Sequence, residues 1–289
     1  MARLKKLPVL LAACVLGAAC SPRTIALRQT AAIVERGAPA LYEEPDPQLA
    51  REAIPSQLKL AEVLLQNEPD DASLLQLSAE GFAGYSFLFL EDTEPARARG
   101  FYARARAYGL RRLAARKEWA GLADLNGEAL DKSLKDARAE DVPALFWTAF
   151  AWAGQINLSR DNPSALAELP KAVAVMERAR QLDPSYHFAG ADLFYGVYYG
   201  SRPAILGGDL KKAQAAFQEA RRRTGGKYLM AYLLEARYYA VAAQDQELFN
   251  TLLNKVLELP AGQLPNARLS DEVAKNKARI LLGKKDELF

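Results

Sequence analysis

Two segments of this chain repeat the same spacing of small and large apolar side chains. Ala213, Phe217 and Ala220 lie at positions i, i+4 and i+7, so an α-helix places all three on one face. In such a helix the alanines allow a second helix to approach closely, and the large residue fills the space between the two helices. The same spacing occurs earlier in the chain, at Ala172, Met176 and Ala179. This repeat constrains the fold more than any other feature, because it predicts packed pairs of helices.

Turn signals and composition extend this prediction to the rest of the chain. Segments with helical periodicity follow one another from Ala50 onward, and turn signals rich in Asp, Pro and Gly separate them, for example at 67–71, 183–185 and 207–209. Alanine and leucine dominate and β-branched residues are sparse, which favours helices over sheets. We therefore predict an all-α fold.

The repeated spacing resembles the second helix of a tetratricopeptide repeat, a helix pair of about 34 residues. The interval between the two copies, from Ala172 to Ala213, is longer than this period, and the segment 201–206 is interpreted as an inserted loop. A further copy is expected near the start of the chain, whereas the region 100–140 fits the pattern poorly. The predicted architecture is a set of helical hairpin repeats of tetratricopeptide type, arranged as an irregular α-solenoid. The residues of the further copy expected near the start of the chain are Leu75, Ala79 and Phe82.

The N-terminus has the features of a secretory signal peptide. Basic side chains precede an apolar run at 7–19, which is too short to span a bilayer comfortably. Small residues lead directly into Cys20, so we expect residues 1–19 to be a lipoprotein signal peptide and Cys20 to be the lipidation site. Two alternatives are lipidation at Cys14, after a shorter apolar run, and an ordinary signal peptide with an incidental cysteine.

This processing predicts how the chain is organised and where it resides. Residues 20–50, which include the Glu- and Pro-rich stretch 43–47, are expected to form the lipid anchor and a tether. Residues 51–289 are expected to form the helical-repeat domain. The mature protein is expected on the periplasmic side of the cell envelope, and Ser21 after Cys20 favours the outer membrane.

Charge and residue content argue against several classes of function. The chain has 38 basic and 35 acidic residues, and residues 1–19 contain three of the basic ones, so the body is balanced and no nucleic-acid partner is expected. Both cysteines, Cys14 and Cys20, lie near the N-terminus and His187 is the single histidine, which disfavours a metal site or a Ser-His-Asp triad. Glu91 and Asp92 lie at a turn-like position and are expected to be solvated. We predict no cofactor and no catalysis.

Two segments predict where binding occurs. Residues 145–154 are apolar nearly all round, which is typical of a central helix. Residues 186–200 contain three glycines among aromatic residues, and each glycine in a helix costs about 1 kcal/mol relative to alanine, so close packing or a close ligand must offset the cost. The alternative is that the aromatic residues only form the core. The predicted concave or pore-facing binding surface comprises Trp147, Trp152, Asn157, Tyr195, Tyr199 and Arg202.

Several short segments, in their order along the chain, carry a resemblance to a known family. They are Tyr85-Ser86-Phe87, the stretch 147–157, Asp183-Pro184-Ser185-Tyr186, Gly207-Gly208-Asp209, Gly226-Lys227-Tyr228-Leu229 and Glu235-Ala236-Arg237-Tyr238-Tyr239. Together they resemble the TatT family, the lipoproteins associated with tripartite ATP-independent periplasmic (TRAP) transporters. The resemblance covers residues 50–260.

The resemblance implies a periplasmic helical-repeat lipoprotein that partners the solute-binding subunit of the transporter. It also implies homotrimers with apolar, pore-like cavities, and therefore a protein that holds or passes an apolar solute. Two other functions are compatible with the residues. One is a lipidated tetratricopeptide scaffold for envelope assembly, of the pilotin or outer-membrane biogenesis type, and the other is an envelope enzyme with a helical body.

Overall fold

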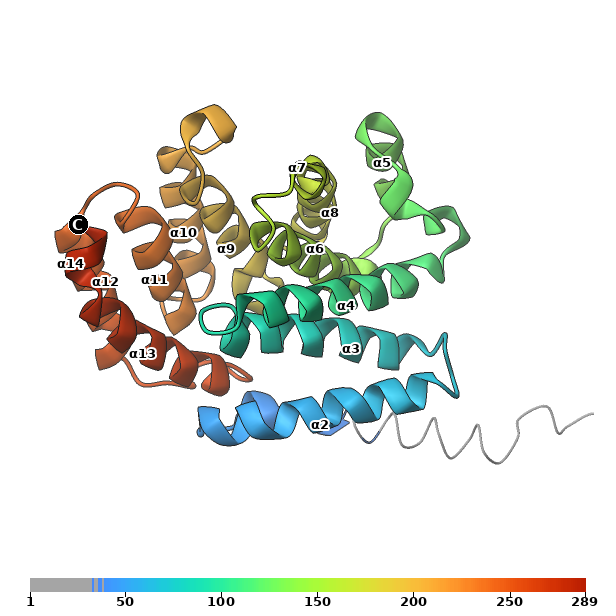
Figure 1. Cartoon of the computed structure of the whole chain (residues 1–289), viewed down its shortest axis with the longest axis horizontal. Coiled ribbons are helices and arrows are strands. Elements are labelled where there is room, and N and C mark those ends of the chain that lie inside the picture. Colours follow the sequence, from blue (N-terminus) through green and yellow to red (C-terminus); the bar gives the residue numbers. More distant parts are fainter. Residues whose placement is uncertain (1–32, 34–35, 38) are drawn as a thin grey trace, which may run out of the picture.

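Helices account for the regular structure in the part of the chain that the structure describes. The computed structural model describes residues 33, 36–37 and 39–289 (Figure 1), and this part contains α-, 3-10 and π-helices but no strand. The prediction of an all-α fold is therefore confirmed. None of the helices in these residues combines the length and apolar character needed to cross a bilayer. The expected signal peptide and Cys20 lie outside the described residues.

The helices form two groups that follow each other in the sequence. The first group comprises α2 (Pro47–Leu65), α3 (Ala72–Tyr85), the π-helix η1 (Ser86–Leu90), α4 (Pro95–Ala114), α5 (Gly127–Leu134), α6 (Val142–Asn157), α7 (Pro163–Ala167) and α8 (Leu169–Leu182). The second comprises α9 (Tyr186–Gly200), α10 (Leu210–Arg223), α11 (Leu229–Glu235), the π-helix η6 (Ala236–Ala240), α12 (Gln246–Glu258), α13 (Arg268–Gly283) and α14 (Lys285–Leu288). Short 3-10 turns occupy Lys117–Trp119, Leu122–Asp124, Ala139–Asp141 and Ala204–Leu206.

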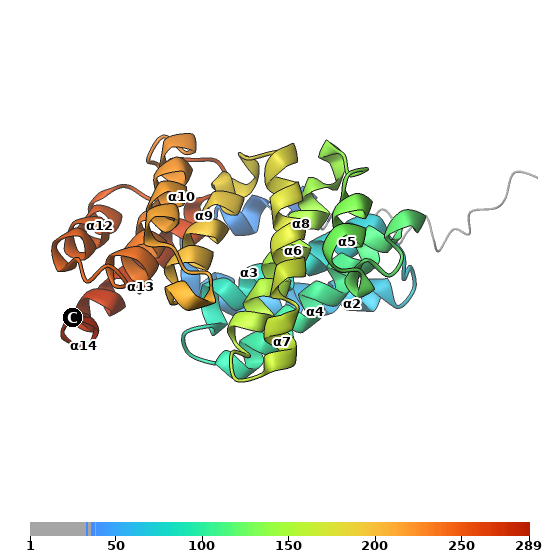
Figure 2. The same ribbon diagram turned by 90° about the horizontal axis from the view of Figure 1, so that it is seen from above.

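Each group has its own hydrophobic core, and the ends of the two groups meet. One cluster of buried side chains lies mainly within α2–α8, and a second lies within α9–α13. Figure 2 shows the two groups as neighbouring halves of the molecule. Helix α13 curls back against α2 (Figure 1), where Leu269 and Val273 bury Ala50. Helix α13, near the C-terminus, therefore contacts α2, the first helix of the first group.

The helices that carry the repeated spacing bury its residues, as predicted. Phe217, Ala213 and Ala220 of α10 are fully buried, and α10 packs along α9. A Cβ added to Gly196 of α9 would lie 2.6 Å from the Phe217 ring, so the glycine leaves the space that the ring occupies. Close helix packing thus offsets the cost of a glycine here. The corresponding residues of α8 and α3 are buried as well, namely Ala172, Met176, Ala179, Leu75, Ala79 and Phe82.

The folded body starts earlier than the domain boundary expected at 50/51, which falls inside α2. Pro47 is the first residue of α2, and the side chain of Asp46 caps the helix by accepting hydrogen bonds from the backbone N–H groups of Gln48 and Leu49. An Asp followed by Pro is a recognisable helix start, so the sequence did carry this signal. Before α2, the hydroxyl of Tyr42 donates a hydrogen bond to Glu80 of α3, so residues of the expected tether contact the body.

Candidate functional site

A cavity of about 220 Å³ lies between the two groups of helices. Its walls come from α2, α3 and α6 of the first group and from α9, α11 and the start of α13 in the second, and both π-helices contribute side chains. π-Helical turns occur frequently at functional sites, because the extra residue in the turn re-aims the side chains. The cavity is thus a product of how the groups assemble rather than of one local motif.

Helices α6 and α9 form the long walls of this cavity. The two helices contact each other near their N-terminal ends. A Cβ on Gly190 of α9 would lie 2.6 Å from the Phe146 ring of α6, so the glycine permits this close contact. At the other end, Asn157 of α6 and Arg202, just beyond α9, both line the cavity. The stretch from Phe146 to Asn157 is roughly 16 Å long at the helical rise, so the lining extends over that length of α6.

Apolar and aromatic side chains dominate the middle of the cavity. Phe87 and Phe150 meet edge to face, with ring centroids 5.5 Å apart, and Phe188 stacks on Tyr228 at 4.4 Å. Leu193, Val197 and Leu234 are among the aliphatic side chains that complete the wall. Such walls, with a few polar groups, are the usual composition of a small-molecule site.

A left-handed turn places His187 in the aromatic wall. His187, Phe188 and Ala189 have φ values of 47°, 59° and 56°, a conformation that costs roughly 1–2 kcal/mol for each non-glycine residue. The turn sets the His187 ring 4.6 Å from the Trp147 ring. Burial lowers the pKa of His187 to about 4, so the imidazole is neutral at neutral pH. Local strain of this kind persists only where the surrounding packing holds it.

Two carboxyl groups line the cavity, and each accepts a hydrogen bond from a tyrosine. Tyr42 donates to Glu80, and Tyr102 donates to Glu91. Burial raises the pKa of both carboxyl groups. Glu91 was expected to be solvated, and that expectation is wrong because the π-helix before it turns its side chain inward. The adjacent Asp92 does face outward, where it binds a lysine and an arginine of the second group, Lys277 at 2.6 Å and Arg237 at 2.7 Å.

Three of the six predicted binding residues line the cavity, namely Trp147, Asn157 and Arg202. Tyr195 and Tyr199 lie instead on the opposite side of α9, in a separate groove bounded by α5, α8 and α10. Tyr198 lies between the two sites and lines both.

Trp152 lines neither the cavity nor the groove, so its assignment to a binding surface is wrong. The side chain is fully buried and its indole N–H donates to Oε2 of Glu168 at 3.0 Å. The guanidinium of Arg106 lies 4.1 Å above the indole ring and also pairs with Glu168. Trp152 therefore joins α6 to α4 and α8 as part of the core. The alternative that these aromatic residues form only the core holds for this residue.

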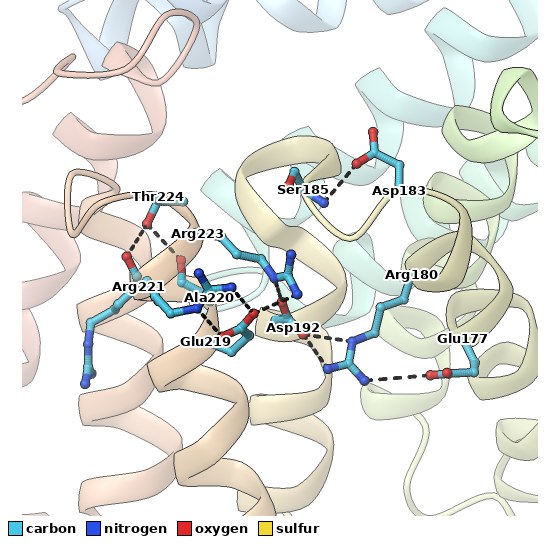
Figure 3. Close-up of polar contacts among 11 residues, drawn as sticks. Glu177, Arg180, Asp183, Ser185, Asp192, Glu219, Ala220, Arg221, Arg223 and Thr224 are labelled. Carbon is cyan, nitrogen blue, oxygen red and sulfur yellow. Dashed lines mark hydrogen bonds and ion pairs between the residues drawn. The ribbon is translucent and has the colours of Figure 1, made fainter.

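A buried ionic cluster fixes α9 between its neighbours (Figure 3). Asp192 of α9 is completely buried, and its carboxylate binds Arg180 of α8 at 2.7 Å and Arg223 of α10 at 2.9 Å. Arg180 lies 3.9 Å from Glu177, and Arg223 lies 2.7 Å from Glu219. One carboxylate thus connects three helices, and it sets the position of the helix that forms the cavity wall. Sequence reasoning missed this residue.

Comparison with known proteins relates this architecture to transport. The family described as TRAP transporter T-component matches residues 43–289, which include every helix from α2 to α14. An uncharacterized protein of Treponema pallidum (strain Nichols) is 23% identical over 267 residues, which cover 86% of this chain and 81% of that protein. The resemblance to TatT seen in the short segments is confirmed by the family match. The chain therefore belongs to the TRAP transporter T-component family.

Proposed function

We propose that this protein is a lipid-anchored periplasmic component of a TRAP transporter, which binds the solute-binding subunit and holds or passes an apolar solute. The observation that carries the proposal is the cavity between the two helix groups, which extends along α6 and has an apolar and aromatic middle. The chain belongs to a transporter family, which supports a role of this cavity in solute binding. Family membership also favours transport over a scaffold for envelope assembly.

The polar groups of the cavity suit binding better than catalysis. Glu80 and Glu91 are each occupied by a tyrosine hydroxyl, and His187 lies among aromatic rings without a polar partner in the described chain. General acid–base catalysis needs a proton donor or acceptor within hydrogen-bond reach of a substrate atom. A wall in which the acids are already hydrogen-bonded offers apolar area and shape, which supports a role in holding a solute.

Binding to the solute-binding subunit is tested with the full chain, purified in mild detergent and immobilised. We expect saturable binding of the TRAP solute-binding protein encoded beside it, and no binding of a solute-binding protein from an unrelated transporter. Absence of binding, with a helical circular dichroism spectrum that shows the chain is folded, would contradict the partner assignment.

A cavity-blocking variant tests the solute part of the proposal separately. Ala153 of α6 lines the cavity and is half-buried, so Ala153→Trp adds bulk where the solute is expected. This variant should bind the partner as the wild type does, yet lose binding of an apolar fluorescent probe. Equal probe binding by both proteins would show that the solute lies elsewhere.

The lipid anchor is tested by fractionation of cells that produce single cysteine variants. Cys20→Ala should abolish lipidation and move the protein from the membrane fraction to the periplasm, or leave it unprocessed. The matched variant Cys14→Ala should stay anchored, because Cys14 lies within the expected signal peptide. The reverse outcome would assign the lipid to Cys14, and recovery in the inner membrane would contradict outer-membrane sorting.

The family resemblance also implies a homotrimer, and this stays a prediction. Sedimentation equilibrium of the full chain in detergent should give three chains per particle.

A further inference from the structure

Arg202 brings a positive charge to one end of the cavity without a negative partner. The side chain is half-buried and lines the cavity, and its guanidinium lies 4.4 Å above the Tyr198 ring. Nη1 donates to the backbone carbonyl of Tyr198 at 2.6 Å, which is the one hydrogen bond of this guanidinium in residues 39–289. A guanidinium has five N–H donors, so most of them are left for another acceptor.

No carboxylate compensates this charge within the described chain. Arg202 forms no ion pair with any described acidic residue. The two carboxyl groups that line the cavity have other partners, because Glu80 accepts a hydrogen bond from Tyr42 and Glu91 accepts one from Tyr102. Burial lowers the pKa of Arg202, and the charge of Arg160 lowers it further. Withdrawing a cation from water without a counter-ion is costly, and proteins normally compensate such a group.

Arg160 adds a second positive charge at the same end. It is exposed, and its Nε donates to Oδ1 of Asn157 at 2.9 Å, which orients an amide that lines the cavity. Arg160 forms no ion pair with a described carboxylate either, and its charge acts on both Arg202 and the phenol of Tyr238. Asn157, Ser201 and Arg202 line this end of the cavity, which we call the basic mouth.

The backbone holds Arg202 in place before any ligand arrives. The loop after α9 closes on itself, because the N–H of Gly208 donates to the carbonyl of Pro203 at 3.1 Å and the N–H of Asp209 donates to that of Tyr199 at 3.1 Å. A Cβ on Gly208 would lie 1.8 Å from the carbonyl oxygen of Arg202, so only glycine permits this closure. A preformed cation binds an anion with little loss of conformational freedom.

We propose that the ligand of this cavity is an amphipathic anion, with one anionic head bound by Arg202 at the basic mouth and an unbranched apolar tail along α6 and α9. The inference rests on the proposed solute-holding function and adds the class of solute and its orientation. A carboxylate or a phosphate pairs with two N–H groups of a guanidinium. The tail would lie against Phe150, Leu193 and Val197.

The test compares three ligands that share one tail and differ in the head. The full chain is held in amphipol and titrated calorimetrically with dodecanoate, dodecyl phosphate and dodecan-1-ol. We expect one or both anions to bind at least about tenfold more tightly than the alcohol. The carboxylate arm represents a free fatty acid and the phosphate arm represents a lipid headgroup, so the tighter of the two identifies the source.

Variants separate the head site from the tail site. Arg202→Gln should reduce the affinity for the anion to that for the alcohol and leave alcohol binding unchanged, which also shows that the variant is folded. Arg99→Gln, an exposed arginine outside the cavity lining, removes the same charge and should change nothing. Ala153→Trp should lose all three ligands.

Two outcomes would overturn the inference, and they differ from failure of the proposed function. Equal affinity of the wild type for the alcohol and both anions would leave an apolar solute but remove the anionic head. Unchanged anion preference in Arg202→Gln would place the head elsewhere. If none of the three ligands binds the wild type, the solute-holding function itself is wrong.

Discussion

Replacing Phe217 by alanine should lower the free energy of unfolding by about 3–5 kcal/mol. The Phe217 ring is fully buried between α10 and α9, and it lies against the bare backbone of Gly196. Removal of the ring loses its transfer free energy and leaves a cavity that two rigid helices cannot close. The measurement is chemical denaturation of the full chain, followed by circular dichroism.

A matched variant on the same helix isolates the effect of burial. Gln218 is the next residue of α10 and is exposed, so Gln218→Ala should change the stability by no more than about 0.5 kcal/mol. A cost below about 1 kcal/mol for Phe217→Ala would contradict the burial of this ring between α9 and α10.

A substitution of Gly196 also tests the contact between Phe217 and Gly196. Gly196→Ala places a methyl group against the ring and should cost about 1–3 kcal/mol through overpacking. The same change should cost less when combined with Phe217→Leu, because the smaller side chain leaves room. Additive costs in this double-mutant cycle would show that the two residues do not share one space.

This packing explains why the fold class could be predicted from the sequence. The spacing of Ala213, Phe217 and Ala220 depends only on helical periodicity, and the structure buries all three. The cost of the glycines in α9 likewise pointed to close contacts, which the structure provides at Gly190 with Phe146 and at Gly196 with Phe217. In α9 and α10, the helical periodicity and the cost of the glycines therefore predict contacts that the tertiary packing provides.

The lining of the candidate cavity could be predicted only in part, because several faces of each central helix are apolar. Trp147 and Trp152 are separated by five positions, so they are about 140° apart around α6, and only Trp147 faces the cavity. In α9 the residues at 190, 194 and 197 share the face that lines the cavity, whereas Tyr195 and Tyr199 share the face of the groove. Sequence alone shows that these helices are central, but not which neighbour each face meets.

Two backbone features of the site have no signal in hydrophobic periodicity. The left-handed turn at His187–Ala189 uses residues that rarely adopt this conformation, so tertiary packing must impose it. The π-helices η1 and η6 begin within the segments Tyr85-Ser86-Phe87 and Glu235-Ala236-Arg237, which carried the family resemblance. The segments that carry the family resemblance therefore include the first residue of each π-helix, although hydrophobic periodicity does not predict this conformation.

Replacing Asp192 by alanine should cost about 3–5 kcal/mol in the free energy of unfolding. The carboxylate is completely buried and is bound by Arg180 and Arg223 from the two flanking helices (Figure 3). Its removal leaves two guanidinium groups without their buried counter-ion. The remaining partners only partly replace it, because Glu177 lies 3.9 Å from Arg180 and the Glu219 carboxylate is more exposed to water than that of Asp192. Asp192→Asn keeps the size but not the charge and should also destabilise the protein.

A compensating triple variant tests whether the cluster stabilises the fold or mainly fixes the position of α9. Buried ion clusters replaced as a whole by apolar side chains are often as stable as the original, whereas loss of one member is costly. The combination of Asp192→Leu, Arg180→Met and Arg223→Met should therefore recover most of the stability lost in Asp192→Ala. Because α9 forms a long wall of the cavity, the same variant should bind dodecanoate more weakly than the wild type. A triple variant as unstable as Asp192→Ala, or a cost of Asp192→Ala below about 1 kcal/mol, would contradict this role for the cluster.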